Sequence, residues 1–358
     1  MIQKIRLFVA AQRFYLAVLA GLCLIYLLLF RHAHSAGAPQ SPESPQYQAF
    51  KQAEKQFQTD LNSEGSLAAL FDRNPVNTVL FLGFSGLFGI LFLGGCFLIT
   101  LLLISKKFRS HWLHFYPLED KTWPAALLLR VLVHFLVLSL LLNLLLSTFV
   151  WLFPGINANV LALVHTGIMD AAVAVILFAE LGFSWKSVKA FGFDLKGRSA
   201  RGEIFFGLSG YMAVIPFFAV LLWGLITLAQ KLSYEPEPHP LVDVFLSQEV
   251  RDQWMIGFSI FLACLWGPFF EEIFFRGLCY PIFKQRVGAL PGGILSALFF
   301  AFIHRNEFAF FPIFLLGLGL VLLYEKRGNL IAPIALHIFH NSLFIGYFFT
   351  AKALMAQG

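Results

Sequence analysis

The chain has 358 residues, of which 58% are hydrophobic and only 13% are charged. A soluble globular domain carries about 25% charged residues, so the composition excludes an ordinary soluble protein and predicts a polytopic membrane protein. The net charge of +6 does not indicate nucleic-acid binding, because no basic patch interleaved with aromatic residues occurs. The four cysteines lie inside apolar runs without a CxxC pair, which is typical of membrane-core residues rather than of a disulfide framework or a zinc site.

Nine apolar segments approach or exceed the roughly 20 residues that a helix needs to cross a bilayer. In chain order they span residues 14–30, 77–105, 124–153, 157–183, 203–230, 254–282, 289–304, 308–324 and 330–350. The predicted fold class is therefore an all-α polytopic integral membrane protein with about eight or nine transmembrane helices. The segments 289–304 and 308–324 are short for a full crossing, which favours a re-entrant or broken helix at one of them.

Lysine and arginine residues between the segments determine the predicted orientation. The connections that a cytoplasmic N-terminus would place inside carry twice as many of these residues as the outer connections. Positive residues accumulate on the cytoplasmic side of membrane proteins. The sequence therefore predicts a protein of the cell (inner) membrane with its N-terminus in the cytoplasm and its C-terminus outside.

The same pattern divides the chain into four predicted parts. They are an N-terminal membrane anchor (1–30), an extracytoplasmic polar insert (31–76), accessory transmembrane helices (77–200) and a C-terminal membrane core (201–350). The anchor could instead be a signal peptide, cleaved at the small residues "AGA" at 36–38. Within the insert, apolar residues from Phe50 to Leu61 recur at helical spacing and predict a surface helix against the membrane or the protein.

Charged residues inside the apolar segments are candidates for function, because a charge near the bilayer centre costs on the order of 3 kcal/mol or more. They are Arg130, Asp170, Glu180, Glu271, Glu272 and Arg276. Arg130 and Glu180 lie near the same ends of neighbouring antiparallel helices and are predicted to pair. Asp170 lies deeper without an evident partner, and a structural hydrogen-bonding role is favoured for it. The glycines at 83, 86 and 89 are predicted to mark a close helix contact.

The stretch "FFEEIFFRG" at 269–277 holds the densest group of these charges. Glu272 and Arg276 are four residues apart, so they share a helical face and are predicted to pair. Glu271 points about 100° away and cannot share that partner equally well. One carboxylate is thus neutralised, while its neighbour stays available as a general base in a dry site.

Two later segments supply polar partners at similar depth. "LFFAFIHRN" carries Phe300 and His304 four residues apart, and "IALHIFHNS" carries His337 and Asn341 at the same spacing. At about 1.5 Å per residue from the nearest cytoplasmic charge, Glu271, His304 and His337 all reach the middle of the hydrocarbon layer. His340 is interpreted as a packing residue or as a residue that supports the site from behind it, because only His337 has Asn341 one turn away.

This set of groups suits hydrolysis of an amide without a cofactor. Glu271, helped by His304, can hold and deprotonate a water molecule. His337 and Asn341 can donate to the developing oxyanion. The alternative use of the same atoms is a divalent metal site with Glu271, His304 and His337 as ligands, although no HExxH motif favours it.

Three motifs together resemble one known family. "EEIFFR" matches EExxxR, "FAFIH" matches FxxxH and "HIFHN" matches HxxxN, in this order and without departure. The chain is in this respect similar to the CPBP family of intramembrane glutamic proteases, which includes the type II CAAX prenyl endopeptidases and the bacterial Abi and bacteriocin-immunity proteins. The resemblance covers roughly residues 200–350.

The resemblance implies a helical membrane fold with a cavity open toward the cytoplasm and the bilayer. It implies that Glu271 works with His304 on the water, that His337 and Asn341 form the oxyanion hole, and that Glu272 and Arg276 support the site. The implied partners are the lipid bilayer and a membrane-associated protein or peptide substrate, such as a prenylated C-terminus, a signal-like peptide or a sorting tail.

Two other functions use the same features. A proton-coupled transporter would employ the buried acids and histidines as a relay, but it should show inverted repeats, which do not occur here. A membrane immunity or scaffold protein would bind a partner through the same fold without turnover. The intact set of Glu271, His304 and His337 favours the endopeptidase over both.

Overall fold

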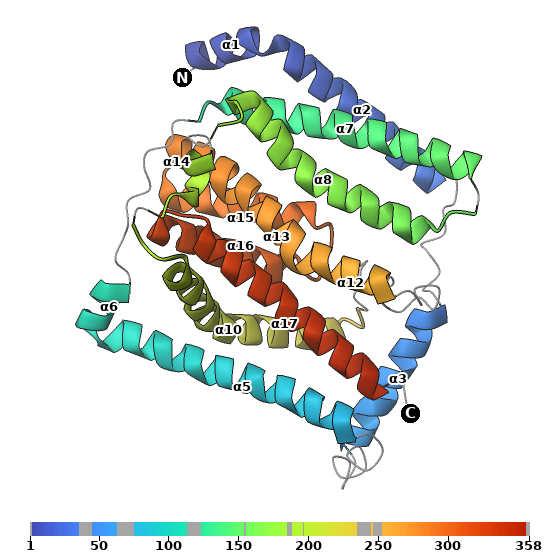
Figure 1. Cartoon of the computed structure of the whole chain (residues 1–358), viewed down its shortest axis with the longest axis vertical. Coiled ribbons are helices and arrows are strands. Elements are labelled where there is room, and N and C mark those ends of the chain that lie inside the picture. The colour runs from blue at the N-terminus through green and yellow to red at the C-terminus, as the bar shows by residue number, and fades with distance from the viewer. Residues whose placement is uncertain are drawn as a thin grey trace.

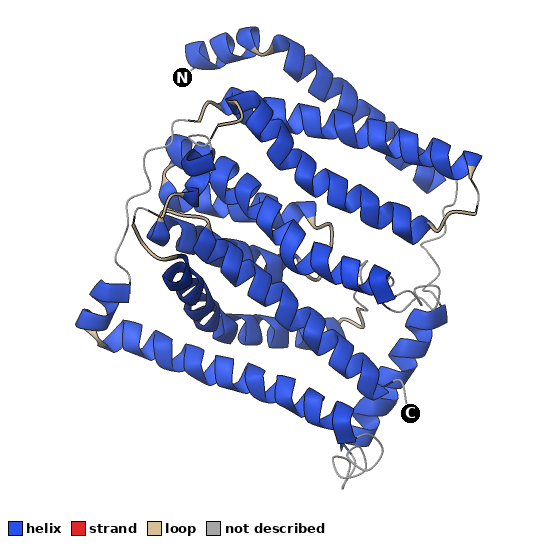
Figure 2. Ribbon diagram, in the orientation of Figure 1, coloured by secondary structure: helices blue, strands red, loops and turns tan. Residues whose placement is uncertain are grey.

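The computed structural model of the protein describes residues 2–35, 45–62, 75–112, 123–153, 155–184, 188–195, 197–234, 245 and 253–355. All regular structure within these ranges is helical, and they contain no strand (Figure 2). The predicted all-α fold is therefore confirmed. The "AGA" sequence at 36–38 lies outside the described residues.

The N-terminal half of the chain forms helices α1 (Ile2–Ala11), α2 (Arg13–Ser35), α3 (Pro45–Asn62), α5 (Pro75–Ile104), α6 (Lys106–Trp112), α7 (Ala125–Leu152) and α8 (Ala158–Leu181), followed by the π-helix η1 (Lys189–Phe193). The C-terminal half forms α10 (Ala200–Lys231), α12 (Gln253–Phe261), η2 (Leu262–Trp266), α13 (Gly267–Glu272), η3 (Ile273–Cys279), α14 (Tyr280–Val287), α15 (Ala289–Ile303), α16 (Phe310–Arg327) and α17 (Ile331–Met355). The elements η2 and η3 are also π-helical.

Each of the nine apolar segments of the sequence coincides with a helix. Among the described residues, six helices are long and apolar enough to cross a membrane, namely α5, α7, α8, α10, α17 and the continuous run from α12 to α14. Two shorter apolar helices, Arg13–Leu29 and Ala289–Ile303, accompany them. The short pair α15 and α16 is unbroken. The 15 residues of α15 rise only about 22 Å, which is short of the roughly 30 Å that a full crossing needs.

The site-bearing helices lie in the middle of the bundle (Figure 1). The run from α12 to α14 packs against α8, α15 and α17, while α7 and α2 follow beyond α8, and α10 and α5 lie beyond α17. In the most apolar window of the 253–287 run, 44% of the residues are buried, against 11% in α5. The first is thus the core helix, whereas α5 presents most of its surface to lipid.

Contacts between the outer helices test three predictions. Arg130 Nη1 lies 3.4 Å from Glu180 Oε2, so the predicted pair between α7 and α8 is confirmed. Helix α3 lies against α17, where the rings of Phe50 and Phe348 are 5.8 Å apart, which confirms a helix packed on the protein.

The prediction for the glycines at 83, 86 and 89 is wrong. No atom lies within 4 Å of a Cβ at any of them. The close contact lies further along α5, at Gly95, where a side chain would meet the backbone carbonyl of Met212 in α10. The glycine spacing alone does not say which turn of a helix faces its neighbour.

A buried carboxylate fastens α10 to the turn between α16 and α17. Glu203, in the first turn of α10, is fully buried. Its carboxylate lies 2.6 Å from Arg327 Nη2 and 3.1 Å from Arg198 Nη1. Arg198 also donates to the backbone carbonyl of Arg327 at 2.7 Å. This network joins the start of α10 to a turn that lies more than 120 residues further along the chain.

We expect Glu203→Gln to lower the free energy of unfolding by roughly 3 kcal/mol, because it removes the carboxylate that lies between two guanidinium groups. Thermal unfolding of the purified protein in detergent measures the change. The exposed neighbour Arg201 provides the control, since Arg201→Gln should leave the melting temperature within experimental error. Equal melting temperatures for Glu203→Gln and the wild type would contradict the fastening role.

Candidate active site

The helix that carries Glu271 and Glu272 departs from α geometry on both sides of them. The π-helix η2 precedes α13 and the π-helix η3 follows it. A π-helical turn contains an extra residue and is frequent at functional sites. Asn341 of α17 donates from Nδ2 to the carbonyl of Ala263 inside η2, at 2.8 Å. The first π-helical turn thus provides the point at which α17 is attached to the core helix.

Glu272 and Arg276 form a fully buried ion pair. Arg276 Nη1 lies 2.8 Å from Glu272 Oε1, and both side chains are 0% exposed. The guanidinium also donates to the carbonyl of Gly317 in α16 at 3.3 Å and lies 4.5 Å from the ring centre of Phe300 in α15. The predicted pairing of these two residues is confirmed, and Arg276 additionally ties three helices together.

His337 lies between the two glutamates. Its Nδ1 is 2.9 Å from Glu272 Oε1, and its Nε2 is 3.8 Å from Glu271 Oε2. A carboxylate only accepts hydrogen bonds, so Nδ1 carries the proton and donates to Glu272. The Nε2 atom is the one that faces Glu271. The contact with Glu272 was not expected from the sequence, because it joins residues 65 positions apart.

His304 ends α15 at the tip of the short hairpin. Its Nδ1 lies 2.7 Å from the carbonyl of Phe300, one turn earlier, so Nδ1 donates and Nε2 is left as the acceptor in the neutral ring. The next residue, Arg305, has a φ of 51°, a left-handed conformation that non-glycine residues rarely adopt. The helix therefore stops abruptly after the histidine.

The ring of Phe300 separates the two histidines. Its centroid is 4.8 Å from the ring of His304 and 5.6 Å from the ring of His337, with near-perpendicular planes in both pairs. No hydrogen bond or ion pair links His304 to Glu271 in the part of the chain that the structure describes. Phe300 is fully buried and belongs to the main hydrophobic cluster, so it determines the spacing of the imidazoles.

Glu271 is the accessible carboxylate of the site. Its side chain is 27% exposed, whereas that of Glu272 is 0% exposed. One oxygen, Oε2, faces His337, and the other, Oε1, lies beside Gly267 in the preceding turn of α13. The arrangement leaves one acid paired in the core and its neighbour open to small molecules.

A further acid, Asp170, lies next to Glu271, although the sequence favoured a structural role for it over a functional one. A Cβ on Gly267 would be 3.7 Å from Asp170 Oδ2 and 3.7 Å from Glu271 Oε1. Asp170 belongs to α8, which packs directly on α13. Its carboxylate makes no hydrogen bond or ion pair with any other described residue. The signal in the sequence was the unpartnered acid at mid-span.

His340 lies away from this group. Its Nδ1 is 3.2 Å from the hydroxyl of Tyr211 in α10, and its ring packs at 4.8 Å from Phe344 and 5.3 Å from Phe218. The interpretation of His340 as a packing residue is therefore confirmed, and α17 presents His337 rather than His340 to the acids.

The described residues contain no group of three or more His, Cys, Asp or Glu side chains placed to hold a metal ion. Glu271, His304 and His337 are thus not arranged as a ligand set in this structure. The alternative metal site predicted from the sequence does not fit the geometry, and no step below depends on a metal.

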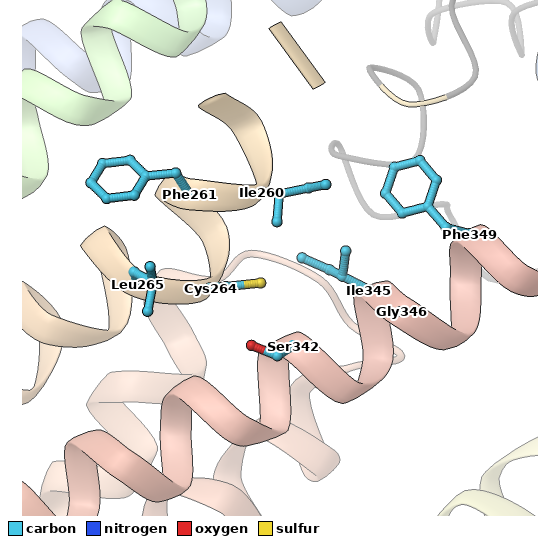
Figure 3. Close-up of a pocket in the computed structure, with 8 residues that line it drawn as sticks. All are labelled: Ile260, Phe261, Cys264, Leu265, Ser342, Ile345, Gly346 and Phe349. Atoms are coloured by element: carbon cyan, nitrogen blue, oxygen red, sulfur yellow. The ribbon is translucent and has the colours of Figure 1, made fainter. Parts of the chain in front are cut away.

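An apolar hollow continues along the contact between the core helix and α17 (Figure 3). It has a volume of about 350 Å³ and begins one residue beyond the Ala263–Asn341 hydrogen bond, at Cys264 and Ser342. These two side chains project from the facing helices, and Phe261 and Phe349 lie further along. The hollow gives the site an apolar neighbourhood in which an extended chain could lie.

We expect Arg276→Met to lower the free energy of unfolding by about 3–5 kcal/mol, because it leaves the Glu272 carboxylate buried without its counter-ion. Thermal or denaturant unfolding of the purified protein measures the change. The matched control is the double variant Glu272→Gln/Arg276→Met, which removes both charges and should be more stable than Arg276→Met alone. Additive losses in the double variant would contradict the coupling of the pair.

The comparison with known proteins concerns this same part of the chain. Residues 253–343 match the family model described as Type II CAAX prenyl endopeptidase Rce1-like. No curated protein and no solved structure matches the chain. The matched range holds the paired glutamates, both histidines of the site and Asn341, and it runs through helices of a membrane-spanning bundle. Residues 253–343 are thus similar to the Rce1-like type II CAAX prenyl endopeptidases, and the long apolar helices make the chain an integral membrane protein.

Proposed function

We propose that the protein is an intramembrane glutamic endopeptidase that hydrolyses a peptide bond of a membrane-associated protein or peptide. The observation that carries the proposal is that the two adjacent glutamates differ in burial and in their partners. Glu272 is buried on Arg276 at 2.8 Å, whereas Glu271 is 27% exposed and faces His337 Nε2 at 3.8 Å. The family match suggests prenylated C-termini as the first substrate class to test.

Glu271 acts as the general base in this mechanism. A catalytic base must reach the proton that it removes, and only an accessible carboxylate meets that condition. The apolar surroundings of α13 exclude bulk water, so few other hydrogen-bond acceptors compete with the Glu271 carboxylate for the attacking water. His304 assists through Nε2, because its Nδ1 proton is donated to the carbonyl of Phe300. The attacking water is then held between two acceptors.

His337 and Asn341 stabilise the oxyanion. Asn341 carries two amide hydrogens, and the bond to Ala263 uses one of them. His337 donates to Glu272 through Nδ1, so its Nε2 can donate to an oxyanion only when the ring carries both protons. The charges then balance, since an imidazolium and a guanidinium face the two glutamates.

The reaction proceeds in two steps without a covalent intermediate. The water oxygen bonds to the carbonyl carbon, its proton moves to Glu271, and the carbonyl electrons move to the oxygen held by His337 and Asn341. The tetrahedral intermediate then collapses, the carbon–nitrogen bond breaks, and Glu271 returns the proton to the leaving nitrogen. The immediate products are a carboxylic acid and an amine.

The proposed location is the cell (inner) membrane with the N-terminus in the cytoplasm. Figure 1 supports the orientation, because α1, α6, α14 and the first turn of α17 lie at one end of the bundle. The basic residues Lys284, Arg286, Lys326 and Arg327 belong to the same end. Positive residues of this kind are retained on the cytoplasmic side.

We expect Glu271→Ala to abolish proteolysis, with loss of at least about 100-fold in turnover, because the general base is removed. Comparative membrane peptidomics of cells with the wild type or the variant measures this and reports substrate and cut site together. Glu271→Gln provides the matched control, since it keeps the shape of the side chain and should be equally inactive. Identical peptide termini in all three strains would remove the basis for an endopeptidase.

We also expect a reporter that is active only outside the cytoplasm to be active when fused after Gly358. The same reporter fused after Arg198, in the connection between α8 and α10, should be inactive. The reason is the distribution of positive charge at the helix ends. Activity in the reverse pattern would show the opposite orientation.

A further inference from the structure

Among the residues that the structure describes, Asp170 is an acid close to the site that has no part in the proposed mechanism. It lies in the middle of the 159–181 span and is half-buried. No described residue provides its carboxylate with a hydrogen bond or an ion pair. An unpaired carboxylate at this depth is costly, and such residues usually serve function.

The placement of Asp170 beside Glu271 is fixed by contacts of neighbouring residues. Trp266 donates from Nε1 to the carbonyl of Gly167 at 2.9 Å, which sets the register of α8 on the core helix. A Cβ on Gly167 would lie 3.3 Å from Leu262, so the two helices are in close contact there. Asp170 follows Gly167 by three residues and therefore shares its face.

The two carboxylates approach the same side of Gly267. Asp170 Oδ2 and Glu271 Oε1 are each 3.7 Å from the position of a Cβ on that residue. Since glycine has no side chain, nothing from α13 separates the two oxygens. A group with several hydrogen-bond donors can therefore contact both carboxylates.

We propose that Asp170 is a further catalytic residue, which binds the amine that peptide hydrolysis releases. This inference rests on the proposed function. When the carbon–nitrogen bond breaks, the nitrogen takes the proton from Glu271, and a second proton from the product carboxyl group makes it an ammonium. The product acid is thereby a carboxylate, and the protons balance.

The chemistry of the product explains the position of the acid. An ammonium in a dry site needs a counter-ion, because the surroundings do not replace its hydration. Glu272 cannot serve, because it is buried on Arg276 and His337. Asp170 lies on the side of Glu271 Oε1, whereas His337 faces Oε2. Asp170 is therefore on the side of the glutamate that is away from the oxyanion donors. The amine and the oxyanion are thereby held at opposite edges of the glutamate.

The test measures binding of a product mimic and does not depend on turnover. The probes are the tripeptide Val-Leu-Phe with a free N-terminus and its N-acetyl form, added to the full-length protein in detergent. Binding raises the melting temperature by an amount that grows with the logarithm of the peptide concentration divided by Kd. We expect the free-amine peptide to bind the wild type at least about 10-fold more tightly than the acetylated peptide.

The variants separate an ion pair from a structural effect. Asp170→Asn keeps size and polarity, and it should bind both peptides alike. Asp170→Glu should restore part of the preference. Thr166→Ala, one turn away on an exposed position of α8, should behave as the wild type.

Two outcomes would overturn the assignment, namely an equal affinity of the wild type for both peptides or an unchanged preference in Asp170→Asn. Because this readout is binding, its failure is distinguishable from that of the proposed function, which the peptidomics of Glu271→Ala tests. Changed termini in Glu271→Ala together with an unchanged preference in Asp170→Asn would leave the endopeptidase standing and remove Asp170 from it.

Discussion

The buried pair of Glu272 and Arg276 is the constraint on which the centre of the molecule depends. A guanidinium without contact to water requires compensating groups, and Arg276 finds the Glu272 carboxylate in α13, the Gly317 carbonyl in α16 and the ring of Phe300 in α15. The same carboxylate oxygen receives His337 from a fourth element, α17. The four helices are therefore held in a single arrangement, since any shift would leave a charge unpaired in an apolar core. Glu271 owes its accessibility to this arrangement, because every strong cation in reach is already taken by its neighbour.

Ion pairs also hold the helices together at one end of the bundle. Glu203 lies between Arg198 and Arg327 at one end of the helices, and Lys284 meets Glu325 at 2.5 Å near the same end. The apolar helices can slide or rotate against lipid at little cost, because lipid and leucine are equally apolar. Directional polar contacts at the helix ends remove that freedom. The proposed chemistry needs this precision, since a misplacement of about 1 Å can cost about 100-fold in rate.

The sequence was sufficient for features that depend on local spacing. The helical conformation of the nine apolar segments follows from their length, and the pairing of Glu272 with Arg276 follows from their separation of four residues. The pair between Arg130 and Glu180 could be predicted from depth alone, because both residues lie near the same ends of antiparallel helices. In each case the positions of the residues along their helices are enough to predict the contact.

Contacts between distant segments could not be predicted in this way. The approach of Asp170 to Glu271 depends on the hydrogen bond between Trp266 and Gly167, which sets the rotation of α8. The bond from His337 to Glu272 depends on the packing of Phe300 between the histidines. The close glycine contact of α5 was misplaced for the same reason, since a single helix carries no information about the rotation of its neighbour.

The π-helical turns of the core helix have a consequence for how its surface is arranged. Each extra residue advances the angular phase by about 100°, so the lipid-facing stripe of α12 is not continuous with that of α14. A helical wheel drawn through residues 253–287 would thus merge faces that are distinct in space. The short α13 has its own phase, which turns Glu272 into the core, and the η3 segment that follows is buried on all sides. Removal of one residue from either turn would rotate α13 by about 100° relative to the segment beyond that turn, and in η3 it would separate Glu272 from Arg276.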